Sequence, residues 1–197
     1  VRYRYTDVSD VFLERAQRRF EAYPFIDYAK FDLDQAPEVQ GYGAGQFDLI
    51  VAANVVHATR NLRLALTRLR DLLAPGGILL LVESTDHMAW FDMTTGLIEG
   101  WQHFDDDLRG DNPLLAPTAW IRALTEAGFE EASSWPAADS RACVLGQHVL
   151  VARVAGEAGS GVGTTDTPDE TASSRSSGTE LRTEEQAGVV KRRVLDA

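Results

Sequence analysis

Two short, almost uninterrupted apolar runs constrain the fold of this chain more than any other feature of its sequence. They cover residues 47–53 and 78–82. Between them lies an amphipathic segment, residues 62–73, whose apolar face carries Leu62, Leu66, Leu69 and Leu73. Continuous apolar runs are typical of strands buried on both faces, and parallel strands need a crossover helix. The pattern predicts a strand–helix–strand unit, with Pro75-Gly76-Gly77 ending the helix.

The remainder of residues 1–154 repeats this alternation. Further strands are predicted over residues 1–6, 26–31 and 147–154. Helices are predicted from Ser9 or Asp10 to Phe20 and over residues 117–127, and irregular segments over residues 35–45 and 87–113. Strand–helix alternation with short connections predicts a doubly wound α/β sheet with right-handed crossovers. In such sheets, ligands bind outside the carboxyl ends of the strands.

The composition of the chain changes near residue 155. Residues 156–180 are rich in Gly, Ser, Thr, Asp and Glu and hold almost no large apolar side chain. Such a segment buries too little surface to offset its ordering entropy, so we expect a flexible linker over residues 155–180. Residues 181–197 regain a helical spacing and predict the start of a following helix or domain. Because the chain begins Val1-Arg2-Tyr3, without Met, we expect it to be part of a longer protein.

Composition argues against several classes of function. The net charge of −11 and the pI of about 4.8 disfavour a nucleic-acid partner, since phosphate binding needs a basic face. No apolar run reaches the roughly 18 residues that a membrane span requires, so no membrane partner is expected. The single cysteine, Cys143, fits a reducing cytosol and predicts a cytoplasmic location. We expect its thiol to be inert.

No metal site is expected. The Cys and His spacings that are typical of zinc sites are absent from the sequence. His103 followed by residues 105–107, three aspartates, could suggest a hard-cation site, but consecutive side chains rarely converge on one ion. A solvated acidic loop is favoured instead. His87 and His148 have no evident partner in the sequence, and structural or surface positions are expected for both.

Acidic residues follow the first two predicted strands. Asp7 ends the first strand, and Asp32 and Asp34 follow the second. A carboxylate at the first position could accept hydrogen bonds from a ribose diol, or could act as a turn residue or helix cap. A carboxylate at the second could accept from an adenine amino group, or could form an Asx-type turn. Position alone leaves both alternatives open.

The next two strands run into Asn54 and His57 and into Glu83. These strands would be neighbours in a doubly wound sheet, so His57 and Glu83 would lie at the same edge. A glutamate that accepts a hydrogen bond from one imidazole nitrogen fixes the tautomer and leaves the other nitrogen as a base. Such a pair suits removal of a proton from carbon or oxygen near neutral pH. The alternative is a histidine that caps a helix and a glutamate on the rim.

Three longer segments resemble the methyltransferase domains of modular polyketide synthases and related nonribosomal peptide synthetases. They are residues 47–59 (FDLIVAANVVHAT), residues 72–83 (LLAPGGILLLVE) and residues 96–101 (GLIEGW). Residues 6–9 (TDVS) and 31–34 (FDLD) match the two earlier strand ends. The LxPGG motif occurs throughout class I methyltransferases, whereas NVxHAT followed by LLVE and GLxxGW is more specific. The resemblance covers residues 1–154.

This resemblance implies a Rossmann-like class I fold and the use of S-adenosyl-L-methionine. Asp7 would bind the ribose hydroxyls of the cofactor. Asp32 would hold the adenine, with Leu33 packing on its ring. Asn54 would lie where the strand end meets the cofactor.

The resemblance also implies roles in catalysis. His57 would be the general base and Glu83 its orienting partner. In carbon-methylating members, this pair removes the α-proton of a β-ketoacyl thioester carried on an acyl carrier protein. The aromatic segment with Trp90, Phe91 and Trp101 would wall the acyl site. Neighbouring domains of a megasynthase are the implied partners.

One departure from the family pattern leaves other functions open. The family's first strand and its Gly-rich loop should precede residue 1, and the glycines of residues 41–45 lie too late in the sequence to replace them. An O-methyltransferase of the same fold is the nearest alternative, since a histidine base serves either acceptor. A non-catalytic, structural methyltransferase-like domain of a megasynthase is another. A dehydrogenase is disfavoured because no GxGxxG motif is present.

Overall fold

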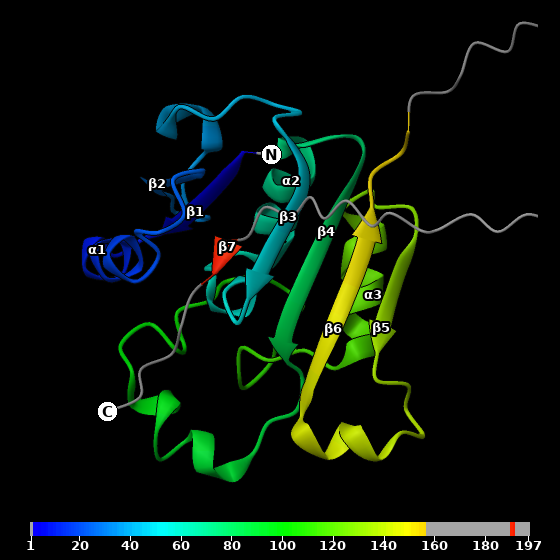
Figure 1. The fold of residues 1–197 in the computed structure, drawn as a ribbon. Helices are drawn as coiled ribbons and strands as arrows, with labels where there is room; N and C mark the ends of the chain where they lie inside the picture. Colours follow the sequence, from blue (N-terminus) through cyan, green and yellow to red (C-terminus); the bar gives the residue numbers. More distant parts are fainter. Residues whose placement is uncertain (1, 157–189, 192–197) are drawn as a thin grey trace, which may run out of the picture.

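The computed structural model describes residues 2–156 and 190–191, which contribute seven strands to one sheet (Figure 1). The strands are β1 (Tyr3–Asp7), β2 (Ile26–Lys30), β3 (Phe47–Ala53), β4 (Leu73–Ser84), β5 (Ala132–Trp135), β6 (Gln147–Arg153) and β7 (Val190–Lys191). Their order across the sheet is β2-β1-β7-β3-β4-β6-β5. Strands β1 to β4 and β7 pair in parallel, whereas β6 is antiparallel to both β4 and β5. The predicted α/β class is confirmed, with an antiparallel edge that the sequence pattern did not predict.

In the part of the chain that the structure describes, three α-helices connect the strands. They are α1 (Asp10–Arg19), α2 (Leu62–Leu72) and α3 (Pro117–Glu126), accompanied by short 3₁₀ turns η1 (Pro37–Gln40), η2 (Val56–Ala58), η3 (Ala89–Phe91), η4 (Thr95–Leu97) and η5 (Arg141–Leu145). The side chain of Asn61 caps α2 by accepting a hydrogen bond from the Leu64 amide at 3.0 Å. Pro117 opens α3, and Gly128, with a φ of 90°, follows its end.

The direction of chain progress reverses in the middle of the sheet. The chain crosses from β1 outward to β2 in one direction, and from β3 to β4 in the other. Right-handed crossovers in opposite directions place α1 and α2 on opposite faces of the sheet. The reversal between β1 and β3 is a topological switch point, where α/β sheets open a crevice at their carboxyl ends. The residues after β1 and β3 are therefore where this fold is expected to bind a ligand.

The main core lies between one face of the sheet and helices α2 and α3. Figure 1 shows both helices behind β3, β4 and β6. Side chains from strands and helices meet there with no exposed surface: Leu62, Leu66, Leu69, Leu79, Leu81, Trp120, Leu124 and Leu150. Leu79 and Leu81 alternate with half-buried residues along β4, so Glu83, two residues further on, faces the same core.

Strand β4 is longer than the sequence pattern predicted. The pattern placed a strand over residues 78–82 after a helix that ended at residue 73, whereas α2 ends at Leu72 and β4 begins at once. Phe47 pairs with Leu73 and Leu49 pairs with Ile78, so residues 74–77 form a bulge within β4. Gly76 adopts a φ of 76° in this bulge, and a Cβ on Gly77 would lie 2.8 Å from the Ala74 carbonyl oxygen.

The structure also differs from the predicted secondary structure at β5 and β7. Strand β5 was not predicted, because its sequence, ASSW, lacks an apolar pattern. Nearly all of the predicted linker, residues 155–180, lies outside the described residues, as does most of the segment 181–197. Within that segment the structure gives β7 as a two-residue strand, where the sequence predicted helix. Strand β7 pairs with Thr6 of β1 and Ala52 of β3 and so separates these two strands.

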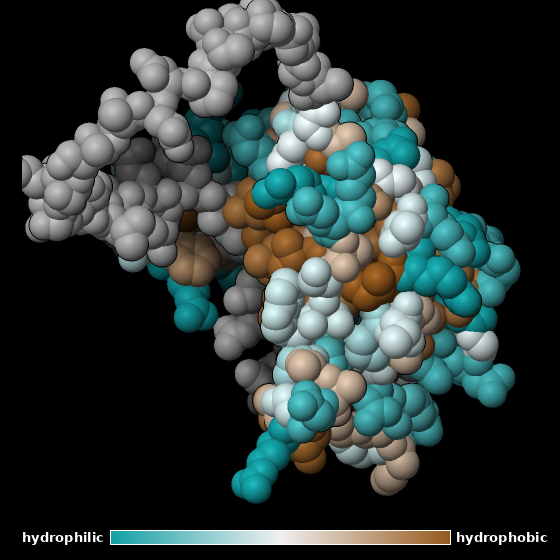
Figure 2. Space-filling view, turned by 90° about the vertical axis from the view of Figure 1, so that its right-hand side faces the viewer, coloured by the Kyte–Doolittle hydropathy of each residue, from teal (hydrophilic) through white to brown (hydrophobic). Residues whose placement is uncertain are grey.

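Within residues 2–156 and 190–191, no helix is long and apolar enough to cross a membrane. Figure 2 shows the face that lies on the right of Figure 1, and hydrophilic residues cover most of it. Apolar residues gather in one stretch near the middle of that view.

Replacement of Leu69 by Ala is expected to destabilise the protein by about 3 kcal/mol, because it opens a cavity beneath the sheet where the side chain is fully buried. Leu64→Ala on the same helix removes a side chain that is 45% exposed and is expected to cost about 0.5 kcal/mol or less. Urea unfolding followed by circular dichroism measures both. Equal losses for the two variants would contradict the assignment of this core.

Candidate active site

An open cleft lies at the switch point of the sheet. Its volume is about 490 Å³, including space open to solvent. The residues that line it lie at the end of β1 or follow β1, β2 and β3: Thr6, Asp7, Val8, Phe31, Asp32, Leu33, Asp34, Val55, Ala58 and Thr59. Three residues predicted at cofactor-binding positions, Asp7, Asp32 and Leu33, are thereby brought to one place by the parallel pairing of β1 with β2.

Local hydrogen bonds fix the two carboxylates of this cleft. Oδ1 of Asp7 accepts from the Ser9 amide at 2.8 Å, and the side chain is 6% exposed. Oδ1 of Asp32 accepts from the Asp34 amide at 2.9 Å, which is the Asx-type turn considered from sequence. Asp32 therefore both forms the Asx-type turn and lines the cleft. The adjacent Leu33 is buried, and its carbonyl accepts a hydrogen bond from Arg68.

One residue of this cleft escaped the sequence analysis. The hydroxyl oxygen of Thr6 is buried and, among the described residues, has no hydrogen-bond partner. Leaving such a group unpaired costs about 1–3 kcal/mol, so a polar ligand in the cleft would gain from bonding it. Nothing in a threonine that ends a strand distinguishes it in sequence from a structural one.

Asn54 joins the ends of β3 and β4. Its Oδ1 accepts hydrogen bonds from the amide and hydroxyl of Ser84 at 3.0 and 3.2 Å. Its φ is 49°, a left-handed conformation that asparagine tolerates better than most residues. The side chain is not among those that line the cleft. Asn54 therefore shapes the turn that carries His57.

His57 and Glu83 form a buried pair at the carboxyl ends of β3 and β4. Nδ1 of His57 lies 2.5 Å from Oε2 of Glu83, and the two side chains are 4% and 0% exposed. Oε1 of Glu83 accepts from the amides of Val55 and Val56 at 3.3 and 2.9 Å. Both oxygens of the carboxylate are thus bonded, and Glu83 anchors the turn as well as the ring. Among the described residues, Nε2 of His57 has no hydrogen-bond partner.

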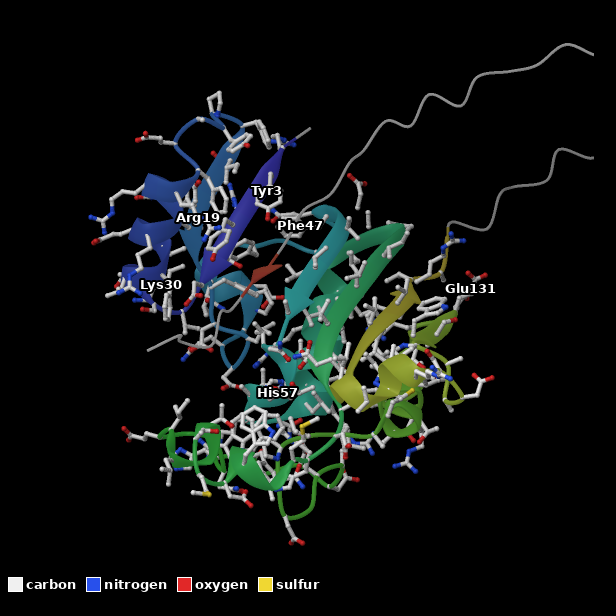
Figure 3. All side chains as sticks on the ribbon, turned by 60° about the horizontal axis from the view of Figure 1, so that its bottom comes forward. Tyr3, Arg19, Lys30, Phe47, His57 and Glu131 are labelled. Carbon is white, nitrogen blue, oxygen red and sulfur yellow. The ribbon has the colours of Figure 1, made fainter. Side chains whose placement is uncertain are left out.

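The predicted aromatic segment packs over this pair. The ring of Trp101 meets that of His57 edge-on at 5.6 Å between centroids. Phe91 lies 6.1 Å from Trp101, and Trp90 lies 4.2 Å from Phe91, so the three rings form a continuous row away from His57. Phe91 is buried, whereas Trp90 is 53% exposed. Figure 3 shows His57 between the strand ends and the green segment that carries these rings.

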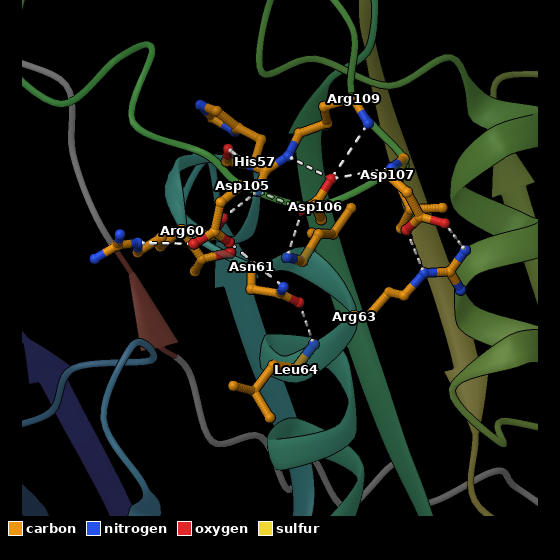
Figure 4. A network of polar contacts seen from close by, with 12 residues as sticks. His57, Arg60, Asn61, Arg63, Leu64, Asp105, Asp106, Asp107 and Arg109 are labelled. Atoms are coloured by element: carbon orange, nitrogen blue, oxygen red, sulfur yellow. Dashed lines mark hydrogen bonds and ion pairs between the residues drawn. The ribbon is translucent and has the colours of Figure 1, made fainter.

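The acidic residues 105–107 do not converge on one point, and the two outer ones, Asp105 and Asp107, are exposed as the prediction of a solvated loop requires. Asp105 pairs with Arg60 at 2.9 Å, and Asp107 pairs with Arg63 at 2.8 Å (Figure 4). Asp106 is buried against Arg109, so the prediction of a solvated loop was wrong for this residue. Among the described residues, no group of three His, Cys, Asp or Glu side chains could hold a metal ion.

The pKa of Asp106 lies below its usual value. Burial alone raises it, but hydrogen bonds from the guanidinium of Arg109 and from the amides of Leu62 and Leu108, with the charge of Arg109, outweigh burial. The spacing of Asp106 and Arg109, three residues apart, was the signal in sequence that could have suggested this ion pair.

The remaining candidates bond to groups outside the pair, although His148 of β6 lies opposite Glu83 in the sheet. His148 is buried, and its Nδ1 lies 2.7 Å from the hydroxyl of Thr85, so a partner exists that the sequence did not reveal. His87 lies 3.2 Å from Asp92. The thiol of Cys143 donates to the Ala137 carbonyl at 3.1 Å.

Comparison with known proteins agrees with this geometry. A family model described as "Methyltransferase domain" matches residues 1–79. The chain is 40% identical over 132 residues to a highly reducing polyketide synthase, g433, of Fusarium, and 40% identical over 154 residues to the polyketide synthase ThaQ of Burkholderia thailandensis. These alignments cover 67% and 77% of the chain but only 5% and 7% of the relatives. The chain thus spans a small part of the curated relatives that it matches.

Solved structures give the same result. The carbon methyltransferase CurJ superposes with a TM-score of 0.75 at 42% identity, covering 78% of this chain and 42% of the other. The trans-methyltransferase CalH, solved in complex with SAH, gives a TM-score of 0.67 at 36% identity, with 78% and 43% covered. Fold and site define a class I methyltransferase domain. Within that class, the chain belongs to the methyltransferase domains of the polyketide synthase type.

The lowered pKa of Asp106 predicts how acid acts on stability. A carboxyl whose pKa is lower in the folded state stabilises the protein above its unfolded value of about 3.9, and this contribution is lost as the pH falls through the folded value. Asp106→Asn lacks that contribution, so its stability should fall less steeply than that of the parent between about pH 5 and pH 2. Urea unfolding across this range tests it, with the exposed Asp111→Asn as control. Parallel curves for parent and Asp106→Asn would contradict the prediction.

Proposed function

We propose that this domain transfers a methyl group from S-adenosyl-L-methionine to the α-carbon of a β-ketoacyl thioester carried on an acyl carrier protein. The observation that carries the proposal is the buried His57–Glu83 pair at the carboxyl ends of β3 and β4, beside a cleft lined by Asp7 and Asp32. Likeness to structures titled as carbon methyltransferases supports the choice of carbon as acceptor.

The cleft suits the cofactor chemically. Asp7 would accept hydrogen bonds from the ribose hydroxyls and Asp32 from the adenine amino group, with Leu33 against the ring. The unpartnered, buried hydroxyl of Thr6 offers a further polar contact. When bound, the cofactor supplies an electrophilic methyl group on sulfur, and the new bond to the acceptor forms as the sulfur–methyl bond breaks.

The chain's own residues would prepare the acceptor. Glu83 would accept a hydrogen bond from Nδ1 of His57, which in the neutral ring leaves the lone pair of Nε2 available to take a proton. Nε2 would take the α-proton of the thioester and leave the carbon nucleophilic. Val55 and Ala58 line the cleft while His57 packs against Trp101, so cofactor and acyl group would meet at the edge of the turn at residues 55–58. Alignment of this kind is worth several kcal/mol.

The wider organisation of the protein is inferred from the same relatives. The named relatives are polyketide synthases many times longer than this chain, which supports neighbouring megasynthase domains as partners. We propose that residues 1–154 belong to the methyltransferase domain and that residues 155–180 link it to the segment 181–197. O-methylation remains the second candidate, because a histidine base serves a hydroxyl or enol as well as a carbon acid.

Asp7→Asn is expected to weaken binding of S-adenosyl-L-methionine about tenfold or more, because loss of a charged hydrogen-bond acceptor costs about 1.5–3 kcal/mol. Isothermal titration calorimetry measures it, with the parent protein and the exposed Asp10→Ala, in the following helix, as references. If Asp7→Asn and the parent bind S-adenosyl-L-methionine with equal affinity, Asp7 does not contribute to cofactor binding. No binding by a folded parent would favour a non-catalytic structural domain.

His57→Gln is expected to lower methyl transfer by about 10²–10⁴-fold while leaving cofactor affinity unchanged, because it removes the general base. The exposed His103→Gln serves as the matched control and should retain parental activity. Mass spectrometry of the product gives the rate, and NMR assigns the new bond to carbon or oxygen. A new methyl–oxygen bond in the product would contradict carbon methylation and support O-methylation, the second candidate.

A further inference from the structure

A buried ion pair holds the main chain of the turn that carries His57. The side chains of Arg109 and Asp106 are 0% and 1% exposed, with Nη2 of Arg109 2.5 Å from Oδ2 of Asp106. Nε of Arg109 lies 3.2 Å from Oδ1 of Asp106, so the guanidinium binds the carboxylate through two nitrogens. The ring of Phe104 lies 4.7 Å from the guanidinium carbon. The pair is thus fixed on several sides.

Three further hydrogen bonds of this pair reach the short turn that carries His57. Nη1 of Arg109 donates to the carbonyl of His57 at 2.7 Å, and Nη2 donates to the carbonyl of Arg60 at 3.0 Å. Oδ2 of Asp106 accepts from the amide of Leu62, the first residue of α2, at 2.7 Å. Figure 4 shows the two side chains beside the turn between His57 and α2. Three main-chain groups of residues 57–62 are therefore held from one side.

His57 is consequently anchored twice, by different elements. Glu83 of β4 holds the ring through Nδ1, whereas Arg109 holds the main-chain carbonyl of the same residue. Fixing the ring at one atom leaves rotation about that hydrogen bond, and fixing the main chain removes it. The segment that carries Arg109 also carries Trp101, whose ring packs on His57. The ion pair thereby fixes the position of the aromatic segment relative to the imidazole of His57.

Stability alone does not account for a pair of this kind. Burying two charges has a large desolvation cost, and apolar residues of similar volume often replace a buried ion pair without loss of stability. The hydrogen bonds of this pair are directed at main-chain groups next to one functional side chain. Misplacement of a catalytic group by about 1 Å can cost about 10²-fold in rate.

We propose that Arg109 and Asp106 are positioning residues that hold His57 where its Nε2 meets the acceptor's proton. This inference rests on the proposed role of His57 as the general base. It predicts that loss of the pair lowers the rate of proton removal and leaves the affinity for the cofactor unchanged.

Two variants test this in the intact protein. Arg109→Lys keeps the charge but loses the planar, two-nitrogen geometry, and Arg109→Met with Asp106→Leu removes both charges at similar volume. Arg63→Met is the matched control, since Arg63 pairs with Asp107 and Glu126 at the surface and bonds no main-chain group of residues 57–62. Thermal unfolding establishes that each variant is folded.

Three measurements separate positioning from stability. Exchange of the α-proton of a β-ketoacyl thioester in D₂O, followed by mass spectrometry, should slow about 10²-fold in both Arg109 variants and stay parental in Arg63→Met. The kcat of methyl transfer should fall with it, with unchanged KM for the thioester and unchanged cofactor affinity. The low-field NMR signal of the His57 Nδ1 proton, assigned by its absence in His57→Gln, should broaden or shift.

Each outcome decides the matter. Parental exchange rates and a parental Nδ1 signal in a folded Arg109 variant would overturn the proposal. Unfolding of both Arg109 variants would assign the pair to stability and overturn it as well. If His57→Gln leaves proton exchange unchanged, the proposed function fails, and the Nδ1 signal still shows whether Arg109 positions His57.

Discussion

The site depends on one carboxylate that has no contact with water. Glu83 lies one residue before the end of β4, and its two oxygens are bonded to the imidazole of His57 and to the amides of Val55 and Val56. A buried carboxylate without such partners would be costly, so the turn after β3 must lie where it can supply them. The parallel pairing of β3 with β4 brings the two strand ends together and makes this possible.

The turn held by Glu83 has a different neighbour on each side. Val55 and Ala58 line the cleft with Asp7 and Asp32, whereas the ring of His57 packs against Trp101. A topological switch point explains the cleft, because strands on its two sides diverge to helices on opposite faces. The carboxylates of the cleft and the histidine pair therefore lie at opposite sides of the turn at residues 55–58.

Arginines pair with the acidic residues of the segment after β4. Residues 105–107 each meet a different arginine, and only Asp106 meets one in the interior. The exposed pairs contribute little, since solvent screens them. The buried pair is instead directed at the main chain around His57, and it connects a segment with little regular structure to the rigid strand ends.

Sequence patterns determined the elements that carry continuous apolar character. Phe47–Ala53 was predicted to the residue, and α2 to within one residue, because burial on both faces of a strand and one face of a helix leaves an unambiguous periodicity. Strand β5 escaped, since ASSW at the sheet edge needs no apolar face. The bulge at residues 74–77 escaped as well, because strand register is a property of two strands rather than one.

Sequence by itself also placed acidic residues and a histidine at strand ends, since strand ends are local features. Only the tertiary structure decided which of them meet. Glu83 and His57 are 26 residues apart and join because β3 and β4 are adjacent, and Arg109 reaches the carbonyl of His57 across 52 residues. Hydrogen bonds between distant segments leave no periodic trace in the chain. Their partners become known only when packing has fixed which side chains are buried together and must satisfy one another.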